Sequence, residues 1–180
     1  MALAGGDTKR SPPGCLALAV AASGHCRGGP PWLRSGGRPG DWLCVSGPLG
    51  GAGAGRHLRV TPRRDVVAAL RGGGVPVHAC LDLSDGLLRN LRQLAVASGC
   101  GARVEAALLP VHPDVGPDRD GVEAALRDGE DFELLLALPA GGPLPPGLVR
   151  IGSLTEDPAL WLEREGASEP WPPGGFEHEF

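Results

Sequence analysis

The chain has 180 residues, of which 30 are glycine and 19 are proline, so more than a quarter of the positions favour turns or interrupt helices. Hydrophobic residues still make up 42 % of the sequence, which predicts a folded chain with one core rather than a disordered chain. The formal net charge of −4 argues against a nucleic-acid-binding protein, because such proteins carry a basic surface. No apolar run approaches the roughly 20 residues that span a bilayer, so no membrane segment is expected.

The five cysteines are widely spaced and include no C-x-x-C pair, which argues against both a zinc site and a disulfide framework. Reduced thiols are typical of cytosolic proteins, so the cysteine usage predicts a cytoplasmic protein.

The first apolar stretch, at residues 15–22, follows Lys9 and Arg10 and therefore resembles a short signal peptide. However, Asp7 and two prolines directly before the stretch are unusual in such a leader. We therefore expect a buried strand over residues 15–23 instead.

Glycine and proline divide the next part of the chain into short elements. After a loop over residues 27–40, an apolar segment predicts a strand at 42–46. This strand runs directly into a glycine-rich segment at residues 47–55, called the glycine loop below. A helix at 64–71 and a mostly apolar strand at 77–83 are predicted to follow.

The clearest helix in the sequence comes next. Ser84 or Asp85 caps its start, leucines recur at helical spacing from Leu87 onward, and Gly99 marks its end. Beyond it the patterns predict strands at 102–106, 132–138, 148–154 and 160–163, and a short amphipathic helix at 119–128. This order predicts an α+β or α/β fold in which helices pack on a sheet.

Most motifs of common enzyme families are absent. A Walker A loop requires Gly-Lys, but the only lysine, Lys9, follows Thr8, and neither G-x-S-x-G nor H-E-x-x-H occurs. The glycine loop follows a predicted strand, but its spacing is not G-x-G-x-x-G. Two interpretations of it stay open: a flexible turn, or a loop that brings backbone N–H groups near a phosphate.

Three groups of acidic residues are the strongest candidates for chemistry. Asp7 follows two glycines, residues 82–86 (DLSDG) lie where a strand gives way to a helix, and residues 129–133 (GEDFE) precede an apolar strand. Each group has a structural alternative, since acids also cap helices or lie solvated before strands. Asp82, however, interrupts an apolar strand, where an unpaired carboxylate is costly to bury. Carboxylate oxygens are preferred Mg²⁺ ligands, so a magnesium–phosphate site accounts for such acids.

Four motifs occur in one order along the chain: GDTKRSP at residues 6–12, RSGGRPGD at 34–41, DLSDGL at 82–87 and GEDFEL at 129–134. Together they resemble the thiamine-monophosphate kinases, a family of the aminoimidazole-ribonucleotide-synthetase-like superfamily. The resemblance extends from about Gly5 to the C-terminus, where the chain ends in a similar glycine–aromatic–acid–histidine sequence. It implies an α+β (α/β-like) C-terminal domain of that superfamily, with helices packed on a mixed sheet.

The resemblance also implies that the chain is truncated at its N-terminus. The family begins with a further domain, so residues 1–27 are expected to be the last strand of an N-terminal ATP-binding domain. Residues 28–180 are then expected to form the C-terminal synthetase-like domain.

The roles that the resemblance implies concern ATP, metal and substrate. It implies ATP contacts by Gly6, Asp7, Arg34 and Ser84, Mg²⁺ ligands in Asp7, Asp82 and Asp85, and substrate contacts by Glu130 and Phe176. A guanidinium group such as that of Arg34 suits phosphate oxygens. The glycine loop lies where the family has its ATP loop.

The implied activity is ATP-dependent phosphorylation of thiamine monophosphate to thiamine diphosphate, with Mg²⁺ assisting in-line transfer. The attacking oxygen is already ionised near neutral pH, so no general base is assigned, and metal ions and cations reduce the repulsion between the two anions. The family also implies a homodimer of the full-length protein. Two alternatives stay open: a relative of the same fold in hydrogenase maturation or purine biosynthesis, or a remnant that binds nucleotide weakly or not at all.

Overall fold

The computed structural model describes residues 12–16, 18–26 and 29–174. The chain divides into two units, residues 1–30 and residues 31–180. In the first unit the described residues are exposed and form no strand, so the strand predicted over 15–23 is not found. An apolar run forms a strand only where a neighbouring strand accepts and donates its backbone hydrogen bonds, and the sheet of the second unit includes no strand from this segment.

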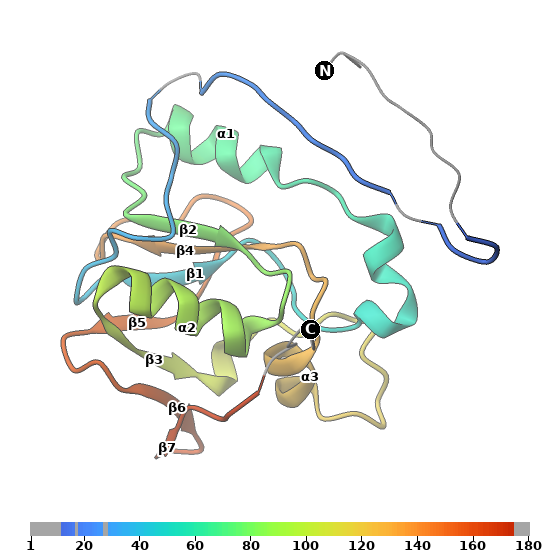
Figure 1. The fold of residues 1–180 in the computed structure, drawn as a ribbon. Helices are drawn as coiled ribbons and strands as arrows, with labels where there is room; N and C mark the ends of the chain where they lie inside the picture. Colours follow the sequence, from blue (N-terminus) through green and yellow to red (C-terminus); the bar gives the residue numbers. More distant parts are fainter. Residues whose placement is uncertain (1–11, 17, 27–28, 175–180) are drawn as a thin grey trace. The chain divides into compact units, whose positions relative to one another are not determined.

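The second unit is built on a seven-stranded mixed sheet (Figure 1). The strands are β1 (Trp42–Val45), β2 (Ala79–Asp82), β3 (Gly101–Glu105), β4 (Leu134–Leu138), β5 (Val149–Thr155), β6 (Leu160–Arg164) and β7 (Ala167–Pro170). Their order across the sheet is β2-β4-β1-β5-β3-β6-β7. Neighbours are antiparallel except for β3 and β6, which are parallel.

Helices cover both faces of this sheet. The α-helices are α1 (Arg64–Gly72), α2 (Leu87–Ser98) and α3 (Gly121–Arg127), and the 3-10 helices are η1 (Ala52–Ala54), η2 (Arg56–Arg59) and η3 (Ala106–Leu108). Figure 1 shows α2 lying along one face of the sheet. None of the helices in the described ranges combines the length and apolar character that a membrane crossing needs.

The two faces of the sheet carry separate apolar clusters. On one face, leucines of α2 such as Leu91 pack on Leu43, Val104 and other strand residues. On the other face, Val66 and Leu70 of α1 pack on the strands β1 and β4. The α+β architecture with helices packed on a mixed sheet is therefore confirmed.

The start of α2 and a few short elements differ from the predictions. Helix α2 begins at Leu87, and its N-cap Gly86 has no side-chain cap, so capping by Ser84 or Asp85 is wrong. The side chain of Asn90 accepts a hydrogen bond from Asp85 N instead. The predicted end of this helix at a left-handed glycine is confirmed. Strand β7 and the two 3-10 helices at the glycine loop were not predicted.

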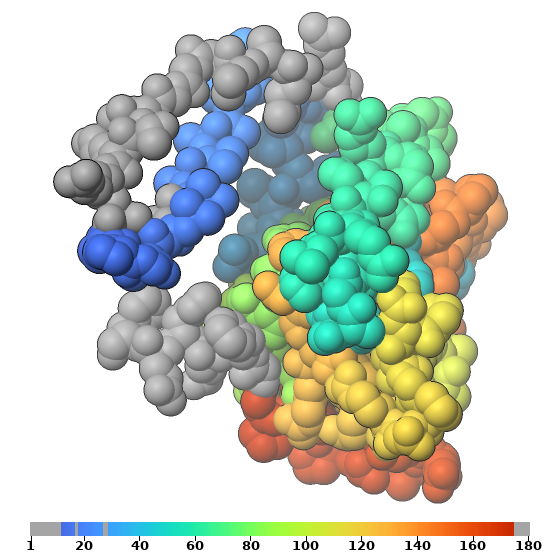
Figure 2. Space-filling model, turned by 90° about the vertical axis from the view of Figure 1, so that its right-hand side faces the viewer, coloured from blue at the N-terminus to red at the C-terminus, as the bar shows by residue number. Residues whose placement is uncertain are grey.

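Two segments far apart in sequence meet beside the glycine loop. Leu49 N donates to Pro110 O at 2.7 Å, and His112 N donates to Leu49 O at 2.8 Å. Leu49 and Val111 also form an isolated parallel bridge. Figure 2 shows the teal residues around η2 lying against the yellow residues of the segment before α3. The glycine loop is thereby attached to the segment that leads into α3.

A substitution in β5 can test the close packing of the sheet. This strand lies between β1 and β3 and contains Gly152. A Cβ atom at Gly152 would lie 2.0 Å from Arg103 O and 2.9 Å from Val104 Cα. We therefore expect Gly152→Ala to lower the free energy of unfolding by about 3 kcal/mol. Urea denaturation measures this change.

The matched control is Gly142→Ala, because a Cβ at Gly142 would meet nothing within 4 Å. We expect this variant to unfold within about 0.5 kcal/mol of the wild type. Equal stability of the two variants would contradict the packing described for β5.

Candidate functional site

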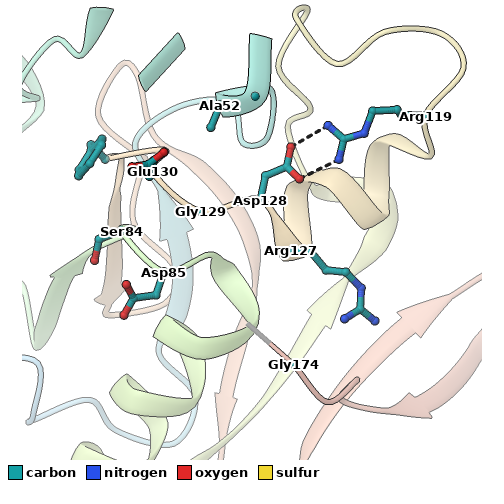
Figure 3. Close-up of a pocket in the computed structure, with 11 residues that line it drawn as sticks. Ala52, Ser84, Asp85, Arg119, Arg127, Asp128, Gly129, Glu130 and Gly174 are labelled. Atoms are coloured by element: carbon teal, nitrogen blue, oxygen red, sulfur yellow. Dashed lines mark hydrogen bonds and ion pairs between the residues drawn. The ribbon is translucent and has the colours of Figure 1, made fainter. Parts of the chain in front are cut away.

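A pocket of about 960 Å³ opens where three segments of the second unit meet (Figure 3). The segments are the glycine loop, the turn between β2 and α2, and residues 128–133, called the acidic segment below. The pocket is lined by Ala52, Gly53, Ser84, Asp85, Arg119, Arg127, Asp128, Gly129, Glu130, Phe132 and Gly174. Its size and mixture of apolar and charged groups are typical of a small-molecule site.

Backbone hydrogen bonds join the β2–α2 turn to the acidic segment. Glu130 N donates to Ser84 O at 2.8 Å, and Phe132 N donates to Leu83 O at 2.9 Å. The approach is close enough that a Cβ on Gly129 would lie 2.9 Å from Ser84 O. Glycine is therefore required at position 129, and Ser84 and Glu130 are held at one wall of the pocket.

The side chains of the acidic segment alternate between the pocket side and the interior. Glu130 and Phe132 have left-handed backbone conformations, with φ of 59° and 53°. Both side chains are exposed, whereas Asp131 between them is buried. Such conformations are costly for residues other than glycine and are found most often at functional sites.

The buried carboxylates of this segment are paired with two arginines. Asp131 Oδ1 accepts a hydrogen bond from Arg56 Nη1 at 2.6 Å. Glu133 accepts from Arg56 Nη2 at 2.8 Å, from Arg63 Nη1 at 3.0 Å and from Ser46 Oγ at 2.6 Å. The alternative that acids before a strand lie solvated is therefore wrong for Asp131 and Glu133.

Burial sets the protonation of Asp131. It raises the pKa of the Asp131 carboxyl group to about 7, although the positive charge of Arg56 and the Gly50 N–H group act in the opposite direction. Only one carboxylate oxygen is engaged, since Asp131 Oδ2 is buried and has no hydrogen-bond partner among the described residues.

The glycine loop is bound by the protein's own carboxylates. Gly50 N donates to Asp131 Oδ1 at 2.9 Å, and Gly51 N donates to Asp128 Oδ2 at 3.0 Å. The loop is thus fixed rather than a flexible turn, and these two N–H groups already have carboxyl oxygens as partners. The N–H groups of the next two residues, Ala52 and Gly53, donate to no described residue, and both residues line the pocket.

The structure brings three of the predicted site residues together. Ser84, Asp85 and Glu130 all line the pocket and come from two different motifs. The Asp85 carboxylate also lies 3.6 Å from Arg89 Nε, one helical turn further along α2.

Asp82 and Arg34 do not line this pocket. Asp82 is exposed at the end of β2, so the expectation of a buried carboxylate is wrong. Burial raises the pKa of the Cys80 thiol, and the negative charge of Asp82 raises it further, which is consistent with a position of Asp82 and Cys80 on the same face of the strand. Arg34 is exposed, and its backbone oxygen accepts from Ser98 Oγ at the far end of α2, about 18 Å of helix away from Asp85. The expected convergence of Arg34 with the two aspartates is therefore not found.

Three predicted site residues, Gly6, Asp7 and Phe176, lie outside the described residues. Within the described ranges, no group of three or more His, Cys, Asp or Glu side chains is arranged to hold a metal ion. The predicted set of three aspartates is thus neither confirmed nor contradicted, because Asp7 belongs to it.

Four pocket residues with charged or aromatic side chains were not predicted as site residues. They are Arg119, Arg127, Asp128 and Phe132. Figure 3 shows Arg119 and Asp128 on the side of the pocket opposite Ser84 and Asp85. Nothing in the sequence marks Arg119, since it belongs to a polar segment without a motif. Phe132 could have been found from GEDFEL, where it is the one aromatic residue among acids.

Asp131 is expected to make stability depend on pH. A folded-state pKa raised to about 7 means that the folded protein binds a proton that the unfolded chain has released above about pH 4. Proton binding by the Asp131 carboxyl group therefore stabilises the folded protein at low pH. This stabilisation is lost as the pH rises to 7. Relative to Asp131→Asn, the wild type should therefore lose up to about 1.4 kcal/mol per pH unit between pH 5 and 7.

Urea unfolding at several pH values measures this difference, and groups common to both proteins cancel. The control is Asp118→Asn, because Asp118 is exposed and forms no ion pair with a described residue. A constant difference between wild type and Asp131→Asn over this range would show that Asp131 stays ionised.

Comparison with known proteins places this site in a family context. Residues 38–142 match the family model "AIR synthase related protein, C-terminal domain". The chain is 39 % identical to the thiamine-monophosphate kinase of Rhodopirellula baltica, over 77 % of this chain and 44 % of that protein. It is 34 % identical to that of Salmonella typhimurium, over 99 % of this chain and 63 % of that protein. The chain therefore matches between 44 % and 63 % of the length of these curated relatives.

Solved structures agree with the sequence matches. A structure of AaThiL complexed with AMPPCP and TMP has a TM-score of 0.69 and 28 % identity, covering 81 % of this chain and 53 % of that one. Escherichia coli HypE, a hydrogenase maturation protein, has a TM-score of 0.61 and 25 % identity, covering 79 % of this chain and 53 % of that one. The similarity to thiamine-monophosphate kinases that the four motifs implied is confirmed. The family model matches more than half of the residues of this chain. The chain therefore belongs to the AIR synthase related proteins and contains their C-terminal domain.

Proposed function

We propose that this chain is the C-terminal part of an ATP-dependent kinase that phosphorylates thiamine monophosphate to thiamine diphosphate. One observation carries the proposal: Ser84, Asp85 and Glu130, from two separate motifs, share one pocket. The similarity to AaThiL, whose structure holds AMPPCP and TMP, supports it. The curated relatives that match are named thiamine-monophosphate kinases.

Within the pocket, Ser84 is proposed to contact ATP and Glu130 to contact thiamine monophosphate. The exposed carboxylate of Glu130 complements the positive charge of a thiazolium ring, and Phe132 beside it offers an apolar surface. The N–H groups of Ala52 and Gly53 offer donors to phosphate oxygens. Gly6, Asp7 and Phe176 are proposed to add contacts of the kinds that the resemblance implies.

The donor set at the β2–α2 junction fits Mg²⁺. Mg²⁺ commonly takes one or two carboxylates together with substrate phosphates, and Asp82 and Asp85 supply two carboxylates that are exposed or partly exposed. These two residues, with Asp7, would hold the ion. Bound Mg²⁺ would reduce the repulsion between the donor and acceptor phosphates.

The remaining expectations are proposals of the same kind. We propose that the full-length protein is a homodimer and acts in the cytoplasm. Arg34 lies apart from the pocket, so an ATP contact by Arg34 within this chain is not part of the proposal.

A second candidate is a HypE-like role in hydrogenase maturation, which the structural match to E. coli HypE favours. Phosphorylation of thiamine monophosphate is better supported, because the relatives with the higher sequence identity are named thiamine-monophosphate kinases. Binding separates the two: thiamine monophosphate should raise the melting temperature of this chain, and a HypE-like protein should not respond.

Glu130 gives the sharpest test of the substrate assignment. We expect Glu130→Gln to weaken binding of thiamine monophosphate about tenfold, since a charge-assisted contact of roughly 1.5 kcal/mol is lost, and to leave AMPPCP binding unchanged. Isothermal titration calorimetry measures both affinities. The matched control is Glu156→Gln, because Glu156 is exposed and its side chain forms no hydrogen bond or ion pair with a described residue.

Activity itself is measured as ADP release with Mg²⁺ and ATP, with and without thiamine monophosphate. The chain is assayed alone and with a complete N-terminal domain of a relative added. Release that depends on thiamine monophosphate in the second assay is the expected result. No such release, even with that domain present, would contradict the proposed function.

A further inference from the structure

We propose that Asp128 is a positioning residue of the pocket, which holds the glycine loop and Arg119 in place to contact the phosphate groups of a bound nucleotide. This inference rests on the proposed function. It concerns a residue that no motif marks, and it depends on three hydrogen bonds to one carboxylate.

The Asp128 carboxylate joins three parts of the chain. Its Oδ2 atom accepts from Gly51 N at 3.0 Å and from Arg119 Nη1 at 2.9 Å, and its Oδ1 atom accepts from Arg119 Nη2 at 2.7 Å. The aspartate side chain is 17 % exposed and that of Arg119 is 51 % exposed. The partner guanidinium lowers the pKa of Asp128, so this carboxylate is charged at neutral pH.

Asp128 is the last point at which the glycine loop is held before the residues that face the pocket. The start of the loop is fixed by the Ser46 hydrogen bonds to β4 and by the Gly50 hydrogen bond to Asp131. The Gly51 N–H group has Asp128 as its acceptor, and Ala52 and Gly53 follow directly at the pocket wall. The carbonyl groups of this turn are held within the loop, since Ala54 N donates to Gly51 O and Gly55 N donates to Ala52 O. Asp128 therefore ties the start of this turn, and with it the two N–H groups at the pocket wall, to the acidic segment.

Arg119 is the second group that Asp128 orients. The bidentate pair uses one N–H on each terminal nitrogen, and a guanidinium has five N–H donors, so three remain for another anion. Arg119 also lines the pocket. Without Asp128, its long side chain would sample many rotamers before it contacted a phosphate.

If Asp128 and Arg119 formed only a structural salt bridge, a different result would be expected. An exposed ion pair contributes little to stability, so its loss would change neither folding nor ligand binding by much. A positioning residue, in contrast, affects ligands with phosphate groups and spares ligands without them. This contrast between two ligands separates the two roles.

The first experiment compares the affinities of the wild type and Asp128→Asn for AMPPCP and for adenosine by calorimetry. Asparagine keeps an acceptor for Gly51 N but loses the charge that pairs with Arg119. We expect affinity for AMPPCP to fall about tenfold, the scale of losing an orienting partner, and affinity for adenosine to change less than about twofold. Asp118→Asn, an exposed aspartate of the same segment, should match the wild type for both ligands.

The second experiment needs no ligand. Asp128→Ala removes the acceptor of Gly51 N, so amide hydrogen exchange at Gly51 should become about tenfold faster, while exchange in β4 stays unchanged. Unchanged exchange at Gly51 would overturn the inference. So would equal AMPPCP affinities of the wild type and Asp128→Asn. A wild type that binds no AMPPCP contradicts instead the nucleotide-binding part of the proposed function.

Discussion

The pairing of two buried carboxylates with two arginines is the interaction on which the site depends. Asp131 and Glu133 precede β4, whereas Arg56 and Arg63 lie beyond the glycine loop. Breaking such a pair leaves an uncompensated charge in the interior, which costs several kcal/mol. The network therefore fixes where the glycine loop lies relative to β4, and thus where the pocket has its wall.

The positions of the pocket residues depend on this network of buried ion pairs. A buried Asp131 places Glu130 and Phe132 on the opposite, exposed side of the acidic segment, at the cost of two left-handed residues. Backbone hydrogen bonds from these two residues to the β2–α2 turn then bring Ser84 beside them. Charge pairing in the interior thus sets the arrangement of the groups proposed to bind substrate and nucleotide.

The sequence predicted the local features of this fold well and the long-range ones poorly. The leucine spacing and Gly99 identified α2, and the motifs identified Ser84, Asp85 and Glu130, because these signals lie within short stretches. The carboxylate partners of the glycine loop lie 77 and 81 residues away, and no local pattern encodes that pairing. The strand expected at 15–23 was wrong for the same reason, since an apolar run does not specify a partner strand.

The most direct test of this account is to map ligand binding on the isotope-labelled chain by NMR, titrating AMPPCP and then thiamine monophosphate in the presence of Mg²⁺. We expect amide shift changes in the glycine loop, at Ser84 and Asp85, and in the acidic segment. Changes confined to the opposite end of α2, around Arg34 and Ser98, or no changes at saturating ligand, would contradict it.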